Sequence, residues 1–158
     1  MNCLGGKAGE PLIVIDYAHT PDALQNVLMA LRSHCRGKLW CIFGCGGDRD
    51  RGKRPLMAQI AEKYSDKLII TQDNSRTEDP KQIFADMVKG LNKPNSVQIE
   101  SDRIQAIMQS IEAAAPSDLI LIAGKGHENY QIVGTEKIPL DDYAEAKKAL
   151  HSRREQCT

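Results

Sequence analysis

Polar and charged side chains gather in four short segments, each of which directly follows an apolar run. The segments are Asp16–Thr20, Gly44–Arg54, Gln72–Asp79 and Gly124–Glu128. The second holds four basic and two acidic residues, a local net charge of +2, among several glycines. Glycine lets a ligand approach the backbone closely, and arginine holds a carboxylate or phosphate through two parallel hydrogen bonds. This segment fits two interpretations, an anion-binding loop or a solvated loop whose own acids and bases are paired.

The third and fourth segments carry more chemistry than a turn requires. Asp, Asn and Ser form turns, and Thr77 suits the cap of a following helix, but neither role needs Arg76. The fourth segment places Lys125, His127 and Glu128 close together. His127 fits three roles, as a general base, a ligand or a hydrogen-bonding scaffold, and so does His19 in the first segment.

Two common kinds of site are not indicated by the sequence. No Walker A pattern occurs, because Gly124-Lys125-Gly126 lacks both the upstream glycine and the following serine or threonine. We therefore expect that this chain does not hold the triphosphate of ATP by itself. Cys41 and Cys45 are the closest pair of the five cysteines and have no second pair to complete a zinc site, so we expect reduced thiols and no metal site.

The composition is typical of a globular protein in the cytoplasm. Of 158 residues, 21 are basic and 21 acidic, and 41% are hydrophobic. A neutral balance argues against a nucleic-acid partner bound through bulk charge. The apolar runs, such as Leu119–Ala123, are too short to cross a bilayer, and the first residues lack the pattern of a signal peptide. We expect no membrane partner.

Alternating strands and helices are predicted to position the four segments. Apolar runs predict strands at 12–15, 38–43, 68–71, 97–100 and 118–123. Apolar residues at three- and four-residue steps predict helices at 21–31, 55–64, 80–91, 102–115 and 141–151. Two further strands, 130–133 and 136–139, flank Gly134-Thr135 as a hairpin.

This order of elements predicts an α/β fold with a mostly parallel sheet, helices on both faces and an antiparallel edge hairpin. In such sheets ligands bind beyond the carboxyl ends of the strands. All four polar segments follow a predicted strand and therefore meet at that edge.

The four segments, in this order, resemble the C-terminal domain of a Mur ligase, the ATP-dependent amino-acid-adding enzymes of peptidoglycan synthesis. The matching stretches are DYAHTP from Asp16, FGCGGDRD from Phe43, KRP from Lys53, DNSRTEDP from Asp73 and GKGHE from Gly124. The resemblance is greatest to the MurE type and spans residues 12 to 150. It implies a Rossmann-like domain at 12–152, a remnant of an interdomain linker at 1–11 and a C-terminal tail at 153–158.

The resemblance also implies the reaction. Such enzymes are similar in joining meso-diaminopimelate to UDP-N-acetylmuramoyl-L-alanyl-D-glutamate through an acyl phosphate. It implies that ATP, Mg²⁺ and the UDP-sugar are bound through two further domains, one of which carries the P-loop. The isolated domain is then expected to be inactive and to bind no cofactor tightly.

The site residues implied by the resemblance form two groups. The amino-acid site comprises Arg49, Asp73, Asn74, Ser75, Arg76, Gly124 and Glu128. The nucleotide-facing residues are Asp16, Tyr17, His19 and Thr20, with His19 as the catalytic candidate. In relatives that add diaminopimelate the motif is Asp-Asn-Pro-Arg, and here Ser75 replaces the proline, which would fix φ.

The choice of amino acid follows from one carboxylate. meso-Diaminopimelate differs from lysine by a carboxylate on the distal carbon. By the resemblance, Arg76 and Asn74 hold that end with help from Arg49, and Gly124 and Glu128 accept the ammonium group. A site built for a carboxylate rejects lysine because its arginine is left unpaired. The alternative function is a non-catalytic Rossmann-like module that binds a small anion or a nucleotide.

Overall fold

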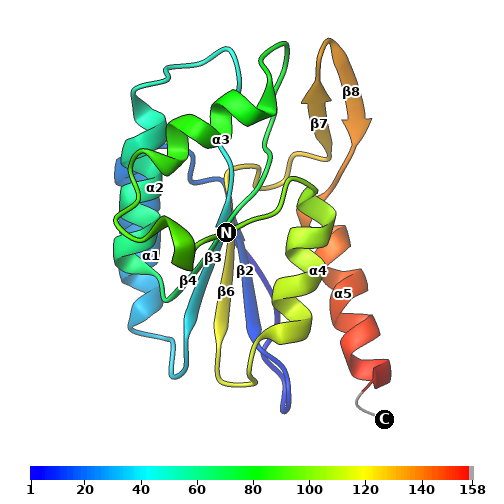
Figure 1. Cartoon of the computed structure of the whole chain (residues 1–158). Helices are drawn as coiled ribbons and strands as arrows, with labels where there is room; N and C mark the ends of the chain where they lie inside the picture. The colour runs from blue at the N-terminus through cyan, green and yellow to red at the C-terminus, as the bar shows by residue number, and fades with distance from the viewer. Residues whose placement is uncertain (157–158) are drawn as a thin grey trace.

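A six-stranded sheet forms the centre of the molecule (Figure 1). It is seen in a computed structural model that describes residues 1–156. The strand order is β1-β2-β6-β3-β4-β5, and only the β1–β2 pair among these neighbours is antiparallel. The strands are β1 Asn2–Gly5, β2 Leu12–Asp16, β3 Leu39–Phe43, β4 Lys67–Ile70, β5 Gln98–Ile99 and β6 Leu119–Ala123. The predicted α/β fold with a mostly parallel sheet is confirmed.

Helices cover both faces of the sheet, with α1, α2 and α3 on one side and α4 and α5 on the other (Figure 1). Successive residues of a strand point to opposite faces, so Cys41 packs in the first core and Ile42 in the second. Every residue of β3 and β6 is buried, as strands covered on both faces require. The helices are α1 Pro21–Arg32, α2 Lys53–Tyr64, α3 Pro80–Val88, α4 Arg103–Ala113 and α5 Asp142–Gln156.

The register of the central strands brings their carboxyl ends to one edge. Asp16, the last residue of β2, lies opposite Ala123, the last residue of β6. Leu119 at the start of β6 lies opposite both Leu12 and Leu39. The segments that follow β2, β3 and β6 therefore leave the sheet at the same level.

The helix that follows β2 begins as its sequence predicts. The hydroxyl of Thr20 accepts a hydrogen bond from the N–H of Ala23 at 3.2 Å, and Pro21 occupies the first turn, where its missing N–H costs nothing. The Thr20 hydroxyl is thus already used as a cap. Asp79 and Asp102 cap α3 and α4 in the same way.

The hairpin differs from its predicted place. Strands β7 (Tyr130–Val133) and β8 (Glu136–Pro139) are antiparallel, as expected, but they form a separate two-stranded sheet. The outer edge of β7 bonds to the loop after β4 through an Arg76–Val133 bridge, so it does not extend the main sheet. The antiparallel edge of the main sheet is β1 instead.

The ends of the chain are also more ordered than the sequence predicts. The resemblance implies a linker remnant at residues 1–11, and all four residues of β1, which lies within it, pair with β2. The predicted tail begins at residue 153, but α5 continues to Gln156, and Arg154 pairs with the buried Glu10 at 2.8 Å. Residues 157 and 158 of that tail lie outside the described part of the chain.

Two predicted elements are shorter than expected. Helix α3 ends at Val88, because a turn bonds the N–H of Gly90 to the carbonyl of Met87. A short 3-10 helix, Pro94–Ser96, leads into β5, which has two exposed residues. Within residues 1–156, no helix combines the length and the apolar character needed to span a membrane.

Candidate functional site

A cavity of about 490 Å³ opens where the segments after β2, β3, β4 and β6 meet. From the predicted amino-acid site, the residues that line it are Arg49, Asp73, Asn74, Arg76, Gly124 and Glu128. From the predicted nucleotide-facing group, they are Tyr17, His19 and Thr20. The tertiary structure therefore brings residues from all four polar segments to one cavity.

Two predicted site residues lie outside the lining of this cavity. Ser75 is 2% exposed, and its carbonyl accepts the N–H of Glu78 at 3.1 Å. The carboxylate of Asp16 accepts the N–H of Ala18 at 3.0 Å. Both residues hold the shape of a loop, and neither side chain reaches the cavity, because local hydrogen bonds or burial direct it elsewhere.

Half of the basic residues in the loop after β3 are neutralised by distant acids. Arg54 is 1% exposed and donates to both carboxylate oxygens of Glu78, at 2.6 and 2.7 Å, and to Asp86 at 2.9 Å. Arg51 donates to Asp86 at 2.9 and 3.2 Å. The paired-loop interpretation is therefore right for Arg51 and Arg54, and their partners come from the next loop and α3.

Three cations at the cavity keep no carboxylate partner within the described residues. Arg49 donates only to the carbonyl of Asp48, at 3.1 Å, and Arg76 donates to the carbonyls of Gly47 and Asn74, at 3.0 and 3.4 Å. Lys53 has no ion pair in residues 1–156. It was not among the predicted site residues, although the basic pattern of its loop was a signal for it. These three side chains offer cationic donors to an anion in a cavity that Asp50, Asp73 and Glu128 also line.

The Arg54 guanidinium holds the pKa of Glu78 at about 2, well below its usual 4.5. Because the folded pKa is the lower one, this pair stabilises the fold fully above pH 4.5 and is lost as the pH falls toward 2. We expect the melting temperature to fall with pH across that window, and to fall less steeply in Glu78→Gln. Melting followed by circular dichroism from pH 2 to 7 tests this. Glu136→Gln, which changes an exposed residue, is the control. If the melting temperature fell equally steeply with pH in the unaltered chain, in Glu78→Gln and in Glu136→Gln, the prediction would be contradicted.

The side-chain amide of Asn74 has a defined orientation. Its Oδ1 accepts the N–H of Ile132 at 2.9 Å. Since a backbone N–H can only donate, this bond assigns the oxygen to β7 and leaves Nδ2 as the donor available to a ligand. Asn74 and Arg76 both line the cavity, so this part of the wall offers donors to an acceptor such as a carboxylate.

The opposite part of the wall carries a carboxylate. Glu128 lines the cavity, and its Oε1 lies 3.9 Å from Nζ of Lys125. Lys125 is fully buried and donates to the carbonyl of Tyr130, and burial lowers the pKa of Lys125. Gly124 has φ +111°, a conformation that residues with a side chain rarely adopt, and a Cβ there would lie 2.7 Å from Oδ2 of Asp73. Glu128 and Asp73 are the anionic acceptors that this part of the wall offers to a ligand.

The segment after β2 forms an exposed rim of the cavity. Nδ1 of His19 lies 2.8 Å from the carbonyl oxygen of Tyr17, which accepts only, so Nδ1 carries the proton and Nε2 is the free acceptor. The rings of His19 and Tyr17 are 4.6 Å apart. His127 is exposed and lies 6.3 Å from the Tyr17 ring, away from the cavity lining.

The closest pair of cysteines, Cys41 and Cys45, is buried. Burial raises the pKa of Cys41 and of Cys45 to about 12, which removes the thiolate needed for redox or nucleophilic chemistry. Among residues 1–156, no three histidine, cysteine, aspartate or glutamate side chains are grouped so that they could hold a metal ion.

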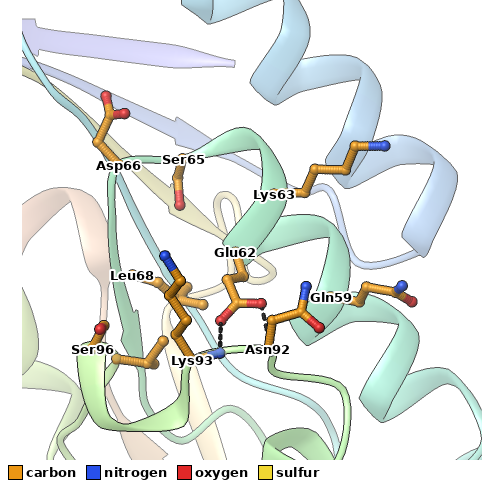
Figure 2. Close-up of a pocket in the computed structure, with 10 residues that line it drawn as sticks. Gln59, Glu62, Lys63, Ser65, Asp66, Leu68, Asn92, Lys93 and Ser96 are labelled. Atoms are coloured by element: carbon orange, nitrogen blue, oxygen red, sulfur yellow. Dashed lines mark hydrogen bonds between the residues drawn. The ribbon is translucent and has the colours of Figure 1, made fainter.

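A second cavity, of about 360 Å³, lies between the end of α2 and the segment before β5 (Figure 2). Its acids already have partners: Glu62 accepts the N–H groups of Asn92 and Lys93 at 2.8 and 2.9 Å, and Asp66 pairs with Arg32. It holds none of the predicted site residues. We assign no ligand to it.

Comparison with known proteins agrees with the fold. The model of the family described as "Mur ligase, glutamate ligase domain" matches residues 1–126. The chain belongs to the Mur ligase family. Within that family, this Mur ligase domain is 59% identical over 133 residues to the UDP-N-acetylmuramoyl-L-alanyl-D-glutamate–2,6-diaminopimelate ligase of Haemophilus influenzae. It is 55% identical over 150 residues to the ligase of the same name from Pseudomonas putida.

These matches cover most of the Mur ligase domain but only part of each relative. The match to the Haemophilus influenzae ligase spans 84% of this chain and 27% of that ligase. The match to the Pseudomonas putida ligase spans 95% of this chain and 30% of that ligase. A solved structure of a ligase with that name has a TM-score of 0.92 and 47% identity, and the match covers 98% of this chain and 31% of that one. The chain therefore spans less than a third of the curated relatives it matches, and it corresponds to their C-terminal domain.

Proposed function

We propose that this chain is the amino-acid-binding domain of an ATP-dependent ligase that adds meso-diaminopimelate to UDP-N-acetylmuramoyl-L-alanyl-D-glutamate in peptidoglycan synthesis. One observation carries the proposal: Asn74 and Arg76, which has no ion pair within residues 1–156, offer donors to the same cavity in which Glu128 offers a carboxylate. The names of the two similar ligases support it. The proposed substrates, a nucleotide sugar and ATP, place the reaction in the cytoplasm.

The distal end of meso-diaminopimelate carries a carboxylate and an ammonium group on one carbon. In the proposed complex the carboxylate meets the Arg76 guanidinium and Nδ2 of Asn74, and Arg49 adds a further positive charge. The ammonium group meets Glu128 and the carbonyl of Gly124. Asp73, also at the cavity, completes the acidic side. Lysine has no carboxylate at this end, so it would leave Arg76 desolvated without a partner.

The proposed reaction forms one peptide bond. The D-glutamyl carboxylate takes up the terminal phosphoryl group of ATP, and the amine of diaminopimelate then attacks the acyl carbon and displaces phosphate. The contribution of this domain is to hold the amine in place, since positioning and electrostatics carry most of such a step. We assign ATP and Mg²⁺ to the rest of the ligase, with the Asp16–Thr20 rim facing the nucleotide and Nε2 of His19 as the catalytic candidate. The domain alone is expected to bind without ligating.

Ligand choice tests the proposal. We expect meso-diaminopimelate, titrated into the chain, to shift the backbone amide NMR signals of residues 73–79 and 124–128. Lysine is expected to shift them far more weakly, because it leaves Arg76 unpaired. Equal shifts with both amino acids would contradict the proposal. Equally strong shifts with inorganic phosphate would favour the alternative, a non-catalytic module for a small anion or nucleotide, because the three unpaired cations would then suffice.

A further inference from the structure

The β7–β8 hairpin stands beside the carboxyl edge of the sheet, next to the loop that follows β4 (Figure 1). No residue from 130 to 139 belongs to either hydrophobic core of the described chain, and none lines the cavity. The hairpin therefore contributes little to the core and does not itself touch a ligand in the cavity. Its contacts indicate a different role.

One side of β7 is bonded along the loop that carries Arg76. Arg76 has φ +53°, a left-handed conformation that a non-glycine residue adopts only when its surroundings hold it there. β7 and the following Gly134 bond to both the N–H and the carbonyl of this residue, and β7 also bonds to the two residues Asp73 and Asn74 that come before it. The N–H of Arg76 donates to the carbonyl of Ile132 at 3.1 Å, and the carbonyl of Arg76 accepts the N–H of Gly134 at 2.6 Å. Ahead of Arg76, Oδ1 of Asn74 accepts the N–H of Ile132 at 2.9 Å, and the carbonyl of Asp73 accepts Nε2 of Gln131 at 3.0 Å.

Tyr130, the first residue of β7, is hydrogen-bonded to the loop that carries Glu128. Nζ of Lys125 donates to the carbonyl of Tyr130 and also lies 3.9 Å from Glu128. Because Lys125 is fully buried, this link has no water to compete with it. β7 is thus bonded at Tyr130 to the loop of Glu128 and, within the next four residues, to the loop of Arg76.

We propose that β7 is a positioning element that fixes the separation between Arg76 and Glu128. It thereby selects a ligand that carries a carboxylate and an ammonium group on one carbon. This inference rests on the proposed function, and it assigns specificity to residues that do not contact the substrate. Gln131 is the positioning residue that can be tested most directly, because its side chain reaches the carbonyl of Asp73 and does not line the cavity.

The test compares the affinities of the chain for meso-diaminopimelate and lysine, both measured by NMR titration. Gln131→Leu keeps the size of the side chain but removes the donor. We expect it to reduce the preference for diaminopimelate about three- to tenfold, the effect of one hydrogen bond, with an unchanged melting temperature. Gln131→Lys, which keeps a donor long enough to reach the carbonyl, is expected to retain the preference. Glu136→Gln, an exposed change in β8, is the matched control.

A larger change removes the whole element. Replacing residues 131–138 by a short glycine–serine link leaves both cores intact and is expected to abolish the preference while the domain still melts cooperatively. In Gln131→Leu, the amide of Arg76 is also expected to exchange its hydrogen faster. If the unaltered chain prefers diaminopimelate and both hairpin variants keep that preference, the inference is overturned and the proposed function stands. If the unaltered chain shows no preference, both fall together.

Discussion

Replacing Asp142 by alanine is expected to lower the free energy of unfolding by about 3–5 kcal/mol, the cost of leaving one partner of a buried ion pair alone. Asp142 accepts two hydrogen bonds of 2.8 Å from Arg103, and both side chains are fully buried. Arg103 also donates to the carbonyls of Gln72 and Ala123, at 3.0 and 3.1 Å. Urea unfolding followed by the fluorescence of Trp40, the single tryptophan, measures the loss.

A second acid on the same helix provides the control. Glu145 pairs with Lys148 at 3.4 Å, and the Lys148 side chain is 75% exposed. The Glu145 side chain is 15% exposed, but its partner keeps most of its contact with water, so this pair contributes about 1 kcal/mol or less and Glu145→Ala is expected to change stability little. Similar losses in Asp142→Ala and Glu145→Ala would show that the buried pair contributes no more than a surface pair. A large difference would identify Arg103 and Asp142 as the support beneath the loops after β4 and β6.

Replacing Arg76 by lysine is expected to weaken the recognition of meso-diaminopimelate by roughly 1.5–3 kcal/mol, about a ten- to hundredfold loss. Lysine keeps the charge but loses the planar fork that grips a carboxylate with two bonds. A lysine at this position also has fewer donors for the carbonyl of Gly47, which Arg76 now contacts at 3.0 Å. The ratio of kcat/KM for diaminopimelate to that for lysine measures the effect. It can be determined with this domain in place of the matching part of the Pseudomonas putida ligase.

Arg51→Lys is the matched control for this change. Arg51 lies in the basic loop, pairs with Asp86 and does not line the cavity. It is therefore expected to leave the kinetics with both amino acids unchanged. Unaltered diaminopimelate kinetics in Arg76→Lys would remove Arg76 from the site, even though the fold and the family would be unaffected.

Local sequence patterns predicted helices and strands well where the pattern of buried and capping residues is sufficient to define them. The continuous apolar run Leu119–Ala123 predicted a central strand, and it is buried at every position between β2 and β3. Thr20 and Pro21 predicted the start of α1. The ends were predicted less well, because β1 has only four residues and its pairing with β2 depends on the fold around it.

The candidate site was predicted from position and resemblance together. Because strands of a parallel sheet end at one edge, the segments after them had to meet, and residues from all four line the cavity. The resemblance, rather than any spacing, suggested which ligand this cavity takes. The exceptions are Ser75 and Asp16, whose burial and local bonds keep them out of the lining.

The sequence by itself determined the alternation of strands and helices and the edge where the polar segments gather, because both follow from periodicity along the chain. Only the tertiary structure decided which cations are free. Arg54 pairs with Glu78, 24 residues away, and Arg51 pairs with Asp86, 35 residues away, whereas Arg49, Lys53 and Arg76 form no ion pair in residues 1–156. The docking of β7 on both loops was decided in the same way. Such pairings depend on which groups the packed layers bring within a few ångströms, and no local pattern encodes that.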